Sequence, residues 1–237
     1  MAIIVGNRIY TDIKRPSREL MEKFRGIPSS NIGDMMNRLY CMNGEIKAYT
    51  DKWLLGPAFT VKVPEGDNVF LHLAMELAQP GDIIVVDGAG CTTRSLMGEM
   101  MFTYSQVKGI GGYVINGAIR DVDSLEHLNM PVYAKAVTPQ GPLKNGPGEI
   151  NVPVCCGGQV VMPGDILVGD GDGICVIRQD EAQTVYEAAR KKMEKEQVTL
   201  KKYMSGDIQK DSSAYMEIAA KLGTWFDCRE NVPAAGK

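Results

Sequence analysis

The chain has 237 residues, a formal net charge of −3 and hydrophobic residues at 44% of its positions, enough for one large domain or a domain with an extension. It has no basic stripe and no aromatic–basic interleaving, so we expect no nucleic-acid partner. No apolar run reaches the roughly 20 residues of a membrane span. The N-terminus lacks a basic region ahead of its short apolar run, so a cytoplasmic protein without a membrane partner is expected.

Taken in order, the chain alternates predicted helices and strands, a pattern typical of the α+β class. The predicted helices cover residues 17–25, a short segment from Ser29, about 68–78, about 95–107, 121–128, 179–203 and 211–222. The predicted strands cover 57–63, 83–86, 113–115 and 132–137, with short strands within 151–156, 159–162 and 174–178. Ser17 is expected to cap the first helix, and Asp67 or Asn68 the third.

The six cysteines show no C-x-x-C spacing, so a structural zinc site is not indicated. Nothing near them in sequence would lower a thiol pKa, so we expect reduced thiols and no Cys–His catalytic pair. Of the two histidines, His72 lies in the apolar helical run VFLHLAMEL, which favours a packed or interface histidine. The cysteines are Cys41, Cys91, Cys155, Cys156, Cys175 and Cys228.

Two segments, PGDIIVVDGAG from Pro80 and PGDILVGDGDG from Pro163, share a Pro-Gly-Asp turn, an apolar strand and a second Asp-Gly turn. A tandem repeat should recur more often, so we interpret the similarity as reused strand–turn chemistry. From Gln179 the chain becomes charged, helical and free of Gly and Pro up to Tyr203. A helical arm of this kind usually packs on a neighbouring surface, here another subunit.

The stretch GGYVINGAIRD at 111–121 organises the chain. Its buried strand is expected to break at Asn116-Gly117 and to deliver Arg120 beside Asp121. The aspartate can hold a hard cation, and the arginine can clamp a carboxylate or an enolate in a planar fork. An ordinary helix start, with Asp121 facing the helix dipole and Arg120 solvated, is the alternative.

Glu99 and Glu196 are further acidic candidates. If a helix begins near Gly98, its free N–H groups point at an anion and Glu99 stands beside that site. A first-turn glutamate that complements the helix dipole is the alternative for Glu99. Glu196 lies in the charged helix, where a surface position is the default and only an intersubunit arrangement would bring it to a site. Asp123 is expected to be solvated.

Between about residues 55 and 222 the chain resembles the family of 4-hydroxy-4-methyl-2-oxoglutarate/4-carboxy-4-hydroxy-2-oxoadipate aldolases, which also includes the regulator of ribonuclease E activity. The resemblance rests on an ensemble of motifs: GDN at 66–68, QPGDIIVV at 79–86, MGE at 97–99, GGYVINGAIRDV at 111–122, VYAKAVTPQG at 132–141, NVPVCCGG at 151–158 and VMPGDILVGDGDGICVI at 161–177.

The resemblance implies a swivelling β/β/α sandwich-like single domain, here 1–178, followed by an intersubunit helical arm, 179–237. It implies a homotrimer or homohexamer with sites between subunits. It also implies a class II aldolase that uses Mg²⁺ or Mn²⁺ to release pyruvate from a small 2-oxo acid, with oxaloacetate decarboxylase side activity. No lysine lies in a setting that favours a Schiff base, which argues against class I chemistry.

By the same resemblance, Asp121 matches the metal-ligating aspartate and Arg120 the arginine on the pyruvyl oxygens. Glu99 stands where the aldolases usually have an aspartate, and it would reach the metal through water. Glu196 matches an acidic residue of the neighbouring subunit, which would also reach the metal through water. The residues that match substrate-binding positions are the backbone segment Gly98, Glu99, Met100 and Met101, with Asn68 and Lys144 as polar pocket residues.

The alternative function is a non-catalytic binding protein like the ribonuclease E inhibitor. That regulator lacks the aspartate after the arginine, which this chain retains as Asp121. Regulator-like members often place a second acid three residues later, where this chain has Ser124. The pattern therefore favours the aldolases, with Arg120, Asp121 and Glu99 as catalytic residues.

Overall fold

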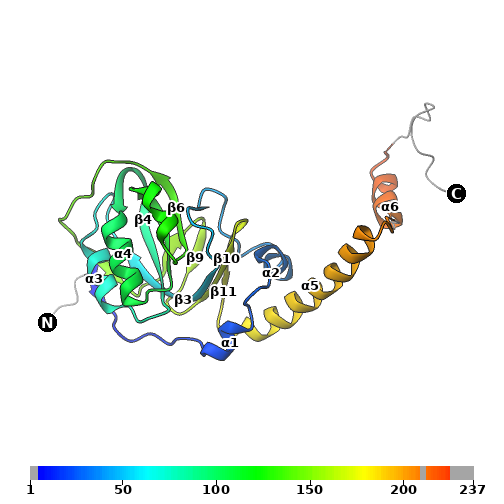
Figure 1. The fold of residues 1–237 in the computed structure, drawn as a ribbon, viewed down its shortest axis with the longest axis horizontal. Coiled ribbons are helices and arrows are strands. Elements are labelled where there is room, and N and C mark those ends of the chain that lie inside the picture. The colour runs from blue at the N-terminus through cyan, green and yellow to red at the C-terminus, as the bar shows by residue number, and fades with distance from the viewer. Residues whose placement is uncertain (1–4, 209–211, 225–237) are drawn as a thin grey trace. The chain divides into compact units, whose positions relative to one another are not determined.

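The computed structural model describes residues 5–208 and 212–224, which group into two compact units, Met1–Glu194 and Lys195–Lys237. The first unit is a mixed sheet with helices packed on it (Figure 1). The second contains the end of the long helix α5 and the helix α6. The α+β class is confirmed, and the division after residue 178 into domain and arm stays a prediction.

The main sheet has the strand order β1-β7-β3-β4-β5-β6-β2, with β10 paired to β3 and to β11. Strands β3 to β6 run parallel, so their carboxyl ends meet at one edge, where ligands bind in sheets of this kind. The strands are β1 (Asn7–Ile9), β2 (Lys47–Ala48), β3 (Leu54–Lys62), β4 (Ile83–Met97), β5 (Gly112–Ile119), β6 (Val132–Val137), β7 (Gly148–Ile150), β8 (Val154–Cys156), β9 (Gln159–Val161), β10 (Ile166–Asp170) and β11 (Gly173–Ile177).

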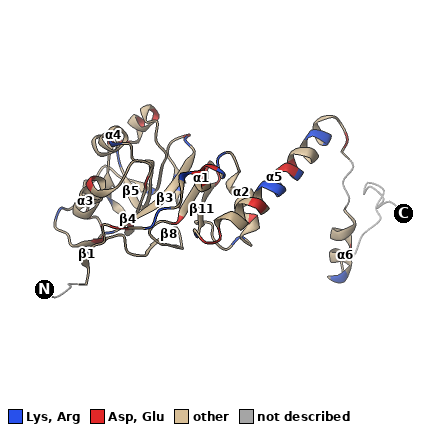
Figure 2. Ribbon diagram, turned by 90° about the horizontal axis from the view of Figure 1, so that it is seen from below, with Lys and Arg blue, Asp and Glu red and all other residues tan. Residues whose placement is uncertain are grey.

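Helices α3 and α4 lie side by side over one face of the sheet (Figures 1 and 2), joined by the hydrogen bond from Tyr104 Oη to Glu76 Oε1 at 2.6 Å. Along α5, basic and acidic residues alternate (Figure 2). Among the described residues, no helix has the length and apolar character needed to cross a membrane. The helices are α1 (Arg18–Glu22), α2 (Ser29–Met35), α3 (Val69–Leu77), α4 (Glu99–Lys108), the 3₁₀ helix η1 (Val122–His127), α5 (Ala182–Met204) and α6 (Ser213–Lys221).

The central strands are buried on both faces, and their side chains alternate between two cores. Ile84 and Val86 of β4 point into the core beneath α3 and α4. Ile83 and Val85 point the other way, into a core that the hairpin β8–β9 helps to form. This double burial explains why these strands read as continuous apolar runs in the sequence.

The two Pro-Gly-Asp segments form the same turn. Gly81 and Gly164 have φ of +89° and +86°, the left-handed conformation that favours glycine. Asp82 and Asp165 each accept a hydrogen bond at 2.8 Å from the amide three residues earlier. Each carboxylate also pairs with an arginine, Arg15 for Asp82 and Arg178 for Asp165. The reuse of strand–turn chemistry is therefore seen in the backbone as well as in the sequence.

Strand β4 is longer than predicted, so the helix expected from about Ser95 is wrong at its start. Three register shifts against β5, between Asp87 and Met97, let the strand continue well beyond residue 86, where the predicted strand ended. Ser95 binds Gln140 O through its amide at 2.8 Å and its hydroxyl at 2.9 Å, and therefore caps no helix. Helix α4 begins at Glu99, with Gly98 as its N-cap.

Two expectations near the organising stretch are also corrected. Strand β5 runs through Asn116-Gly117, because pairing with Asp87 and Cys91 of β4 keeps the two residues in the strand where a turn was expected. The predicted helix at 121–128 is the 3₁₀ helix η1, and Asp121 precedes it in the left-handed conformation, with φ of 59°.

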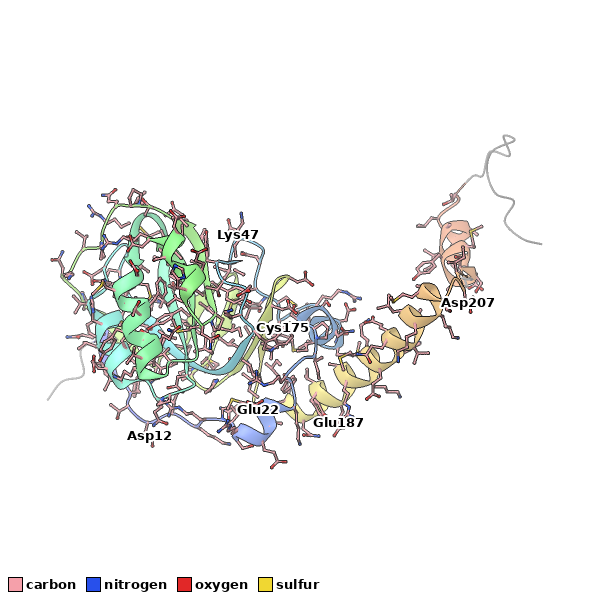
Figure 3. The ribbon with its side chains drawn as sticks, viewed as in Figure 1. Asp12, Glu22, Lys47, Cys175, Glu187 and Asp207 are labelled. Atoms are coloured by element: carbon pink, nitrogen blue, oxygen red, sulfur yellow. The ribbon has the colours of Figure 1, made fainter. Side chains whose placement is uncertain are left out.

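The described cysteines are free thiols. Cys175 on β11, labelled in Figure 3, lies opposite Cys41 in an isolated antiparallel bridge, with the two Sγ atoms 3.7 Å apart. Burial raises the pKa of the Cys175 thiol, so this thiol is unreactive. Cys228 lies outside the described residues.

We expect Arg15→Met to lower the free energy of unfolding by about 3 kcal/mol, because it leaves a buried carboxylate without its bidentate partner. Arg15 holds Asp82 at 2.8 and 2.7 Å, and the Asp82 side chain is 1% exposed. Arg25→Met is the control: its partner Glu22 (Figure 3) is 42% exposed, so the loss should stay below about 1 kcal/mol. Urea unfolding of both variants measures the difference, and equal losses would contradict it.

Candidate active site

A pocket of about 230 Å³ opens at the carboxyl edge of the parallel strands, between the first turns of α3 and α4, the ends of β4 and β5, and the loop after β6. Seven of the predicted site residues line it, from four separate segments of the chain. Its lining residues are Asn68, His72, Ser95, Leu96, Met97, Gly98, Met100, Met101, Arg120, Asp121, Pro142 and Lys144.

Gly98 makes room for the charged pair. Its backbone is extended, with φ of −148°, so any residue could adopt this conformation. A Cβ at this position, however, would overlap Asp121 Oδ2 and lie 2.9 Å from Arg120 Cγ. The glycine is therefore required by close approach and not by backbone freedom.

Asp121, which follows the end of the neighbouring strand β5, caps helix α4. Gly98 has no side chain to cap the helix, and Asp121 Oδ2 accepts a hydrogen bond from Glu99 N at 3.1 Å in its place. The same oxygen lies 3.4 Å from Arg120 Nε. Within residues 5–208 and 212–224, Oδ1 has no hydrogen-bond partner. The carboxylate is 43% exposed, so this second oxygen is open to a ligand.

A hydrogen bond holds the backbone of Arg120, whereas its guanidinium is exposed to solvent. Its amide donates to Met97 O at 3.1 Å, which holds the residue at the end of β4. Its side chain is 45% exposed, and Nη1 lies 3.4 Å from the position that a Cβ of Gly141 would take. The guanidinium thus lies between the strand ends and the loop after β6, with nitrogen donors left for a bound anion.

The role of Glu99 in reaching a metal through water stays a prediction. Glu99 is exposed, and its side chain is not among the described residues that line the pocket. Its amide is engaged by Asp121, and the amides of Met101 and Phe102 donate to Gly98 O at 3.1 Å. Met100 carries the amide of this turn that has no acceptor among the described residues. The expectation of several free N–H groups at this helix start is therefore corrected.

Asn68 carries an unsatisfied acceptor into the pocket wall. It is 2% exposed, and its Nδ2 donates to Leu96 O at 2.8 Å. Its Oδ1 is buried and finds no partner in the described part of the chain. Such an atom costs about 1–3 kcal/mol unless a ligand or water satisfies it. A donor group on a bound molecule would therefore be favoured here.

The charges of the pocket favour an anionic ligand. Arg120 and Lys144 are both positive, against the single carboxylate of Asp121. His72, missed as a site residue, lies on α3; its pKa is lowered by partial burial and by the nearby Lys144 ammonium. Its imidazole is therefore neutral at pH 7 and can donate or accept a hydrogen bond. Ser95, Leu96, Met97 and Pro142 were also missed, because only the bulged strand and the loop bring them to the pocket.

A metal would have few protein ligands here. Among the described residues, no group of three or more His, Cys, Asp or Glu side chains could hold an ion. One carboxylate oxygen of Asp121 with water suits a hard cation such as Mg²⁺, which keeps several waters in protein sites. The donor set therefore fits the predicted cation. Glu196 belongs to the second unit, and its role in a neighbouring subunit's site stays a prediction.

The family model described as RraA-like (Aldolase/RraA) matches residues 29–176. A protein of Halalkalibacterium halodurans, named "Putative 4-hydroxy-4-methyl-2-oxoglutarate aldolase", is 39% identical over 175 residues, 73% of this chain and 83% of that protein. An Arabidopsis thaliana protein, named "Putative 4-hydroxy-4-methyl-2-oxoglutarate aldolase 3", is 37% identical over 53% of this chain and 75% of its own.

Among solved structures, Streptomyces coelicolor RraAS2, described as an unusual member of the RNase ES inhibitor RraA family, has a TM-score of 0.72. It is 27% identical, over 79% of this chain and all of its own. Shared fold does not decide between an enzyme and an inhibitor, so the residues of the pocket must carry that argument.

We expect Asp121→Ala to lower the free energy of unfolding by about 1 kcal/mol, because it removes the cap of α4. Asp121→Asn should stay within about 0.5 kcal/mol of the wild type, since an amide oxygen can still accept from Glu99 N and asparagine tolerates the left-handed conformation. Urea unfolding compares the three proteins. Wild-type stability in the alanine variant would show that the bond from Glu99 does not support the helix.

Proposed function

The chain belongs to the RraA-like family, and we propose that it is a class II, divalent-metal-dependent aldolase. Its proposed substrate is 4-hydroxy-4-methyl-2-oxoglutarate or 4-carboxy-4-hydroxy-2-oxoadipate, cleaved to pyruvate plus pyruvate or oxaloacetate. Oxaloacetate decarboxylation is the proposed side activity, because it passes through the same pyruvate enolate. The names of the curated relatives support an aldolase.

One observation carries the proposal: the adjacent Arg120 and Asp121 stand 3.4 Å apart, Nε to Oδ2, at the mouth of an anion-favouring pocket. Cleavage of the C3–C4 bond leaves negative charge on the 2-oxo oxygen of the pyruvyl fragment. A guanidinium held at a strand end can bind that oxygen and a carboxylate oxygen in one plane. Because it is already in place, it stabilises the enolate without reorganising.

Asp121 is the residue that would hold Mg²⁺ or Mn²⁺, through the oxygen that α4 does not use. When bound, the cation supplies Lewis-acid polarisation of the substrate's keto oxygen. Asp121 and Arg120 then act on the same end of the substrate from adjacent backbone positions. The oxygen donor set is the support for a hard cation.

The far end of the substrate is proposed to meet Lys144 and Asn68. The Lys144 ammonium has no ion-pair partner within residues 5–208 and 212–224, so it can attract the substrate's second carboxylate. Asn68 lines the pocket, and its side-chain amide is the proposed polar contact for the C4 hydroxyl. Glu99, exposed at the start of α4, is proposed to pass the proton of that hydroxyl through solvent water. The amide of Met100 can donate to the pyruvyl carboxylate.

The predicted homotrimer or homohexamer, with Glu196 of the partner subunit completing the site through water, remains part of this proposal. Several apolar side chains on α3 and α4 next to the pocket are exposed. They are Leu73, Leu77, Met100, Tyr104 and Val107. Exposed apolar patches of this kind mark interaction sites, which supports a subunit contact beside the pocket.

The second candidate is a non-catalytic binding protein that inhibits a ribonuclease, and the likeness to RraAS2 favours it. The two candidates differ in one measurement. A panel of 4-hydroxy-2-oxo acids, with pyruvate detected by coupled lactate dehydrogenase, should give metal-dependent turnover for an aldolase. No turnover on any of them, combined with inhibition of a ribonuclease, would support the binding protein.

Pyruvate release should stop after exhaustive EDTA treatment and return with Mg²⁺ or Mn²⁺. Asp121→Asn should stay inactive on metal addition and lose Mn²⁺ binding in a paramagnetic titration, although its fold is kept. Asp123→Asn is the matched control: Asp123 is an exposed carboxylate two residues away that does not line the pocket, and it should behave as the wild type. Full activity after metal removal would contradict the proposed metal dependence.

Arg120→Lys and Arg120→Ala should each lose roughly 10²–10³ in kcat, by analogy with the removal of one oxyanion donor. Lysine keeps the charge but cannot bind two oxygens in one plane. Metal affinity should change little in either variant, because Asp121 remains. If Arg120 only attracts an anionic substrate, lysine should restore most of the rate and alanine should mainly raise KM. Near-native kcat in the lysine variant would refute the clamp.

A further inference from the structure

The loop between β6 and β7, residues 138–147, carries Pro142 and Lys144 to the pocket without any helix or strand of its own. A loop this open needs fixed attachments if its side chains are to have defined positions. Its first half is attached to β4: Arg94 Nη1 donates to Gly141 O at 3.1 Å, and Ser95 Oγ donates to Gln140 O at 2.9 Å.

The second half of the loop is held by one carboxylate, Asp67. Its Oδ2 accepts hydrogen bonds from the amides of Asn145 at 2.6 Å and Gly146 at 3.0 Å. Its Oδ1 accepts from Val69 N at 3.0 Å, which is the helix-capping role that the sequence suggested. Asp67 is 2% exposed, so these bonds are shielded from water and strong.

Lys144 is therefore clamped on both sides along the chain. The residue before it, Leu143, donates to Gly66 O at 2.8 Å and accepts from Asn68 N at 3.2 Å. The residue after it, Asn145, is held by Asp67. The segment that clamps Lys144 is thus the same segment that places Asn68 in the pocket wall. His72 of α3 and Lys144 both line the pocket, and the nearby ammonium lowers the pKa of His72.

We propose that Asp67 is a positioning residue, which sets Lys144 against the end of the substrate distal to Arg120. It acts through the loop and not on the reacting atoms, because it is buried behind the pocket wall and does not line the pocket. The inference rests on the proposed aldolase function. In this view, residues at the strand ends bind the pyruvyl end of the substrate, and the loop that Asp67 holds binds its distal end.

The test is Asp67→Asn, which keeps size and burial but leaves one oxygen for three amide donors, because its NH₂ group must face either Val69 N or the amides of Asn145 and Gly146. For the full substrate, kcat/KM should fall by about tenfold or more, since a lost charge-assisted contact is of that order. Exchange of the pyruvate methyl protons with deuterium, followed by NMR, should stay within about twofold of the wild type, because it needs only the pyruvyl end.

Three comparisons make the result decisive. Lys144→Met, an exposed change that does not threaten the fold, should reproduce the loss. The double variant should be no worse than either single one, because the two residues act in series. Asp123→Asn, an exposed aspartate outside the pocket, should behave as the wild type.

The proposal is overturned if Asp67→Asn loses pyruvate proton exchange as heavily as turnover, if Lys144→Met has native kcat/KM, or if the double variant is additive. A separate readout needs no activity: amide hydrogen exchange at Asn145 and Gly146 should accelerate in Asp67→Asn. If the wild type releases no pyruvate, the aldolase proposal fails on its own and the distal-end role falls with it. Unchanged amide exchange in that variant would overturn the anchor itself.

Discussion

The absence of a side chain at Gly98 is the constraint on which the pocket depends. Strands β4 and β5 end together because Met97 pairs with Ile119, so the next residues of the two strands meet. Any Cβ at position 98 would push the carboxylate of Asp121 away from the start of α4. With glycine there, one carboxylate joins the two strand ends, caps the helix and holds the guanidinium beside it. The contact of the Asp121 carboxylate with Glu99 N and Arg120 therefore fixes both the start of α4 and the charges at the pocket.

Asp121 has a structural and a proposed chemical task, and its geometry accommodates both. Oδ2 faces the N–H of Glu99 and the guanidinium of Arg120, two positive groups that hold the carboxylate in place. Oδ1 has no hydrogen-bond partner in the described part of the chain. A cation at Oδ1 would add to this arrangement without breaking the cap. The pair can thus be fully ordered before a ligand binds, which is what electrostatic stabilisation of an enolate requires.

The sequence predicted the elements whose pattern is local. Strand β6 matches its predicted bounds, and Ser17 caps α1 as expected, with its hydroxyl accepting from Leu20 N at 3.2 Å. The short strands β1, β2 and β7 were missed, because two or three residues show no periodicity and pair only through tertiary contacts. The bulges of β4 were missed for the same reason. Arg120 was predicted from its own motif beside Asp121, and Asn68 and Lys144 came from family resemblance, whereas His72 and Ser95 had no local signal as site residues.

The backbone of Asp121 has an uncommon conformation. Asp121 occupies the left-handed region, which is uncommon for residues with a side chain but which aspartate and asparagine enter more readily than most. With Asp121 and Arg120 in place, a Cβ at position 98 would overlap their side chains, so Gly98 supplies no side-chain cap and Asp121 supplies it. The fold has placed its capping group after the neighbouring strand, in this conformation, next to an arginine that is half exposed. The left-handed backbone of Asp121 is held by its hydrogen bond to the start of α4, and the same geometry suits the proposed catalytic role.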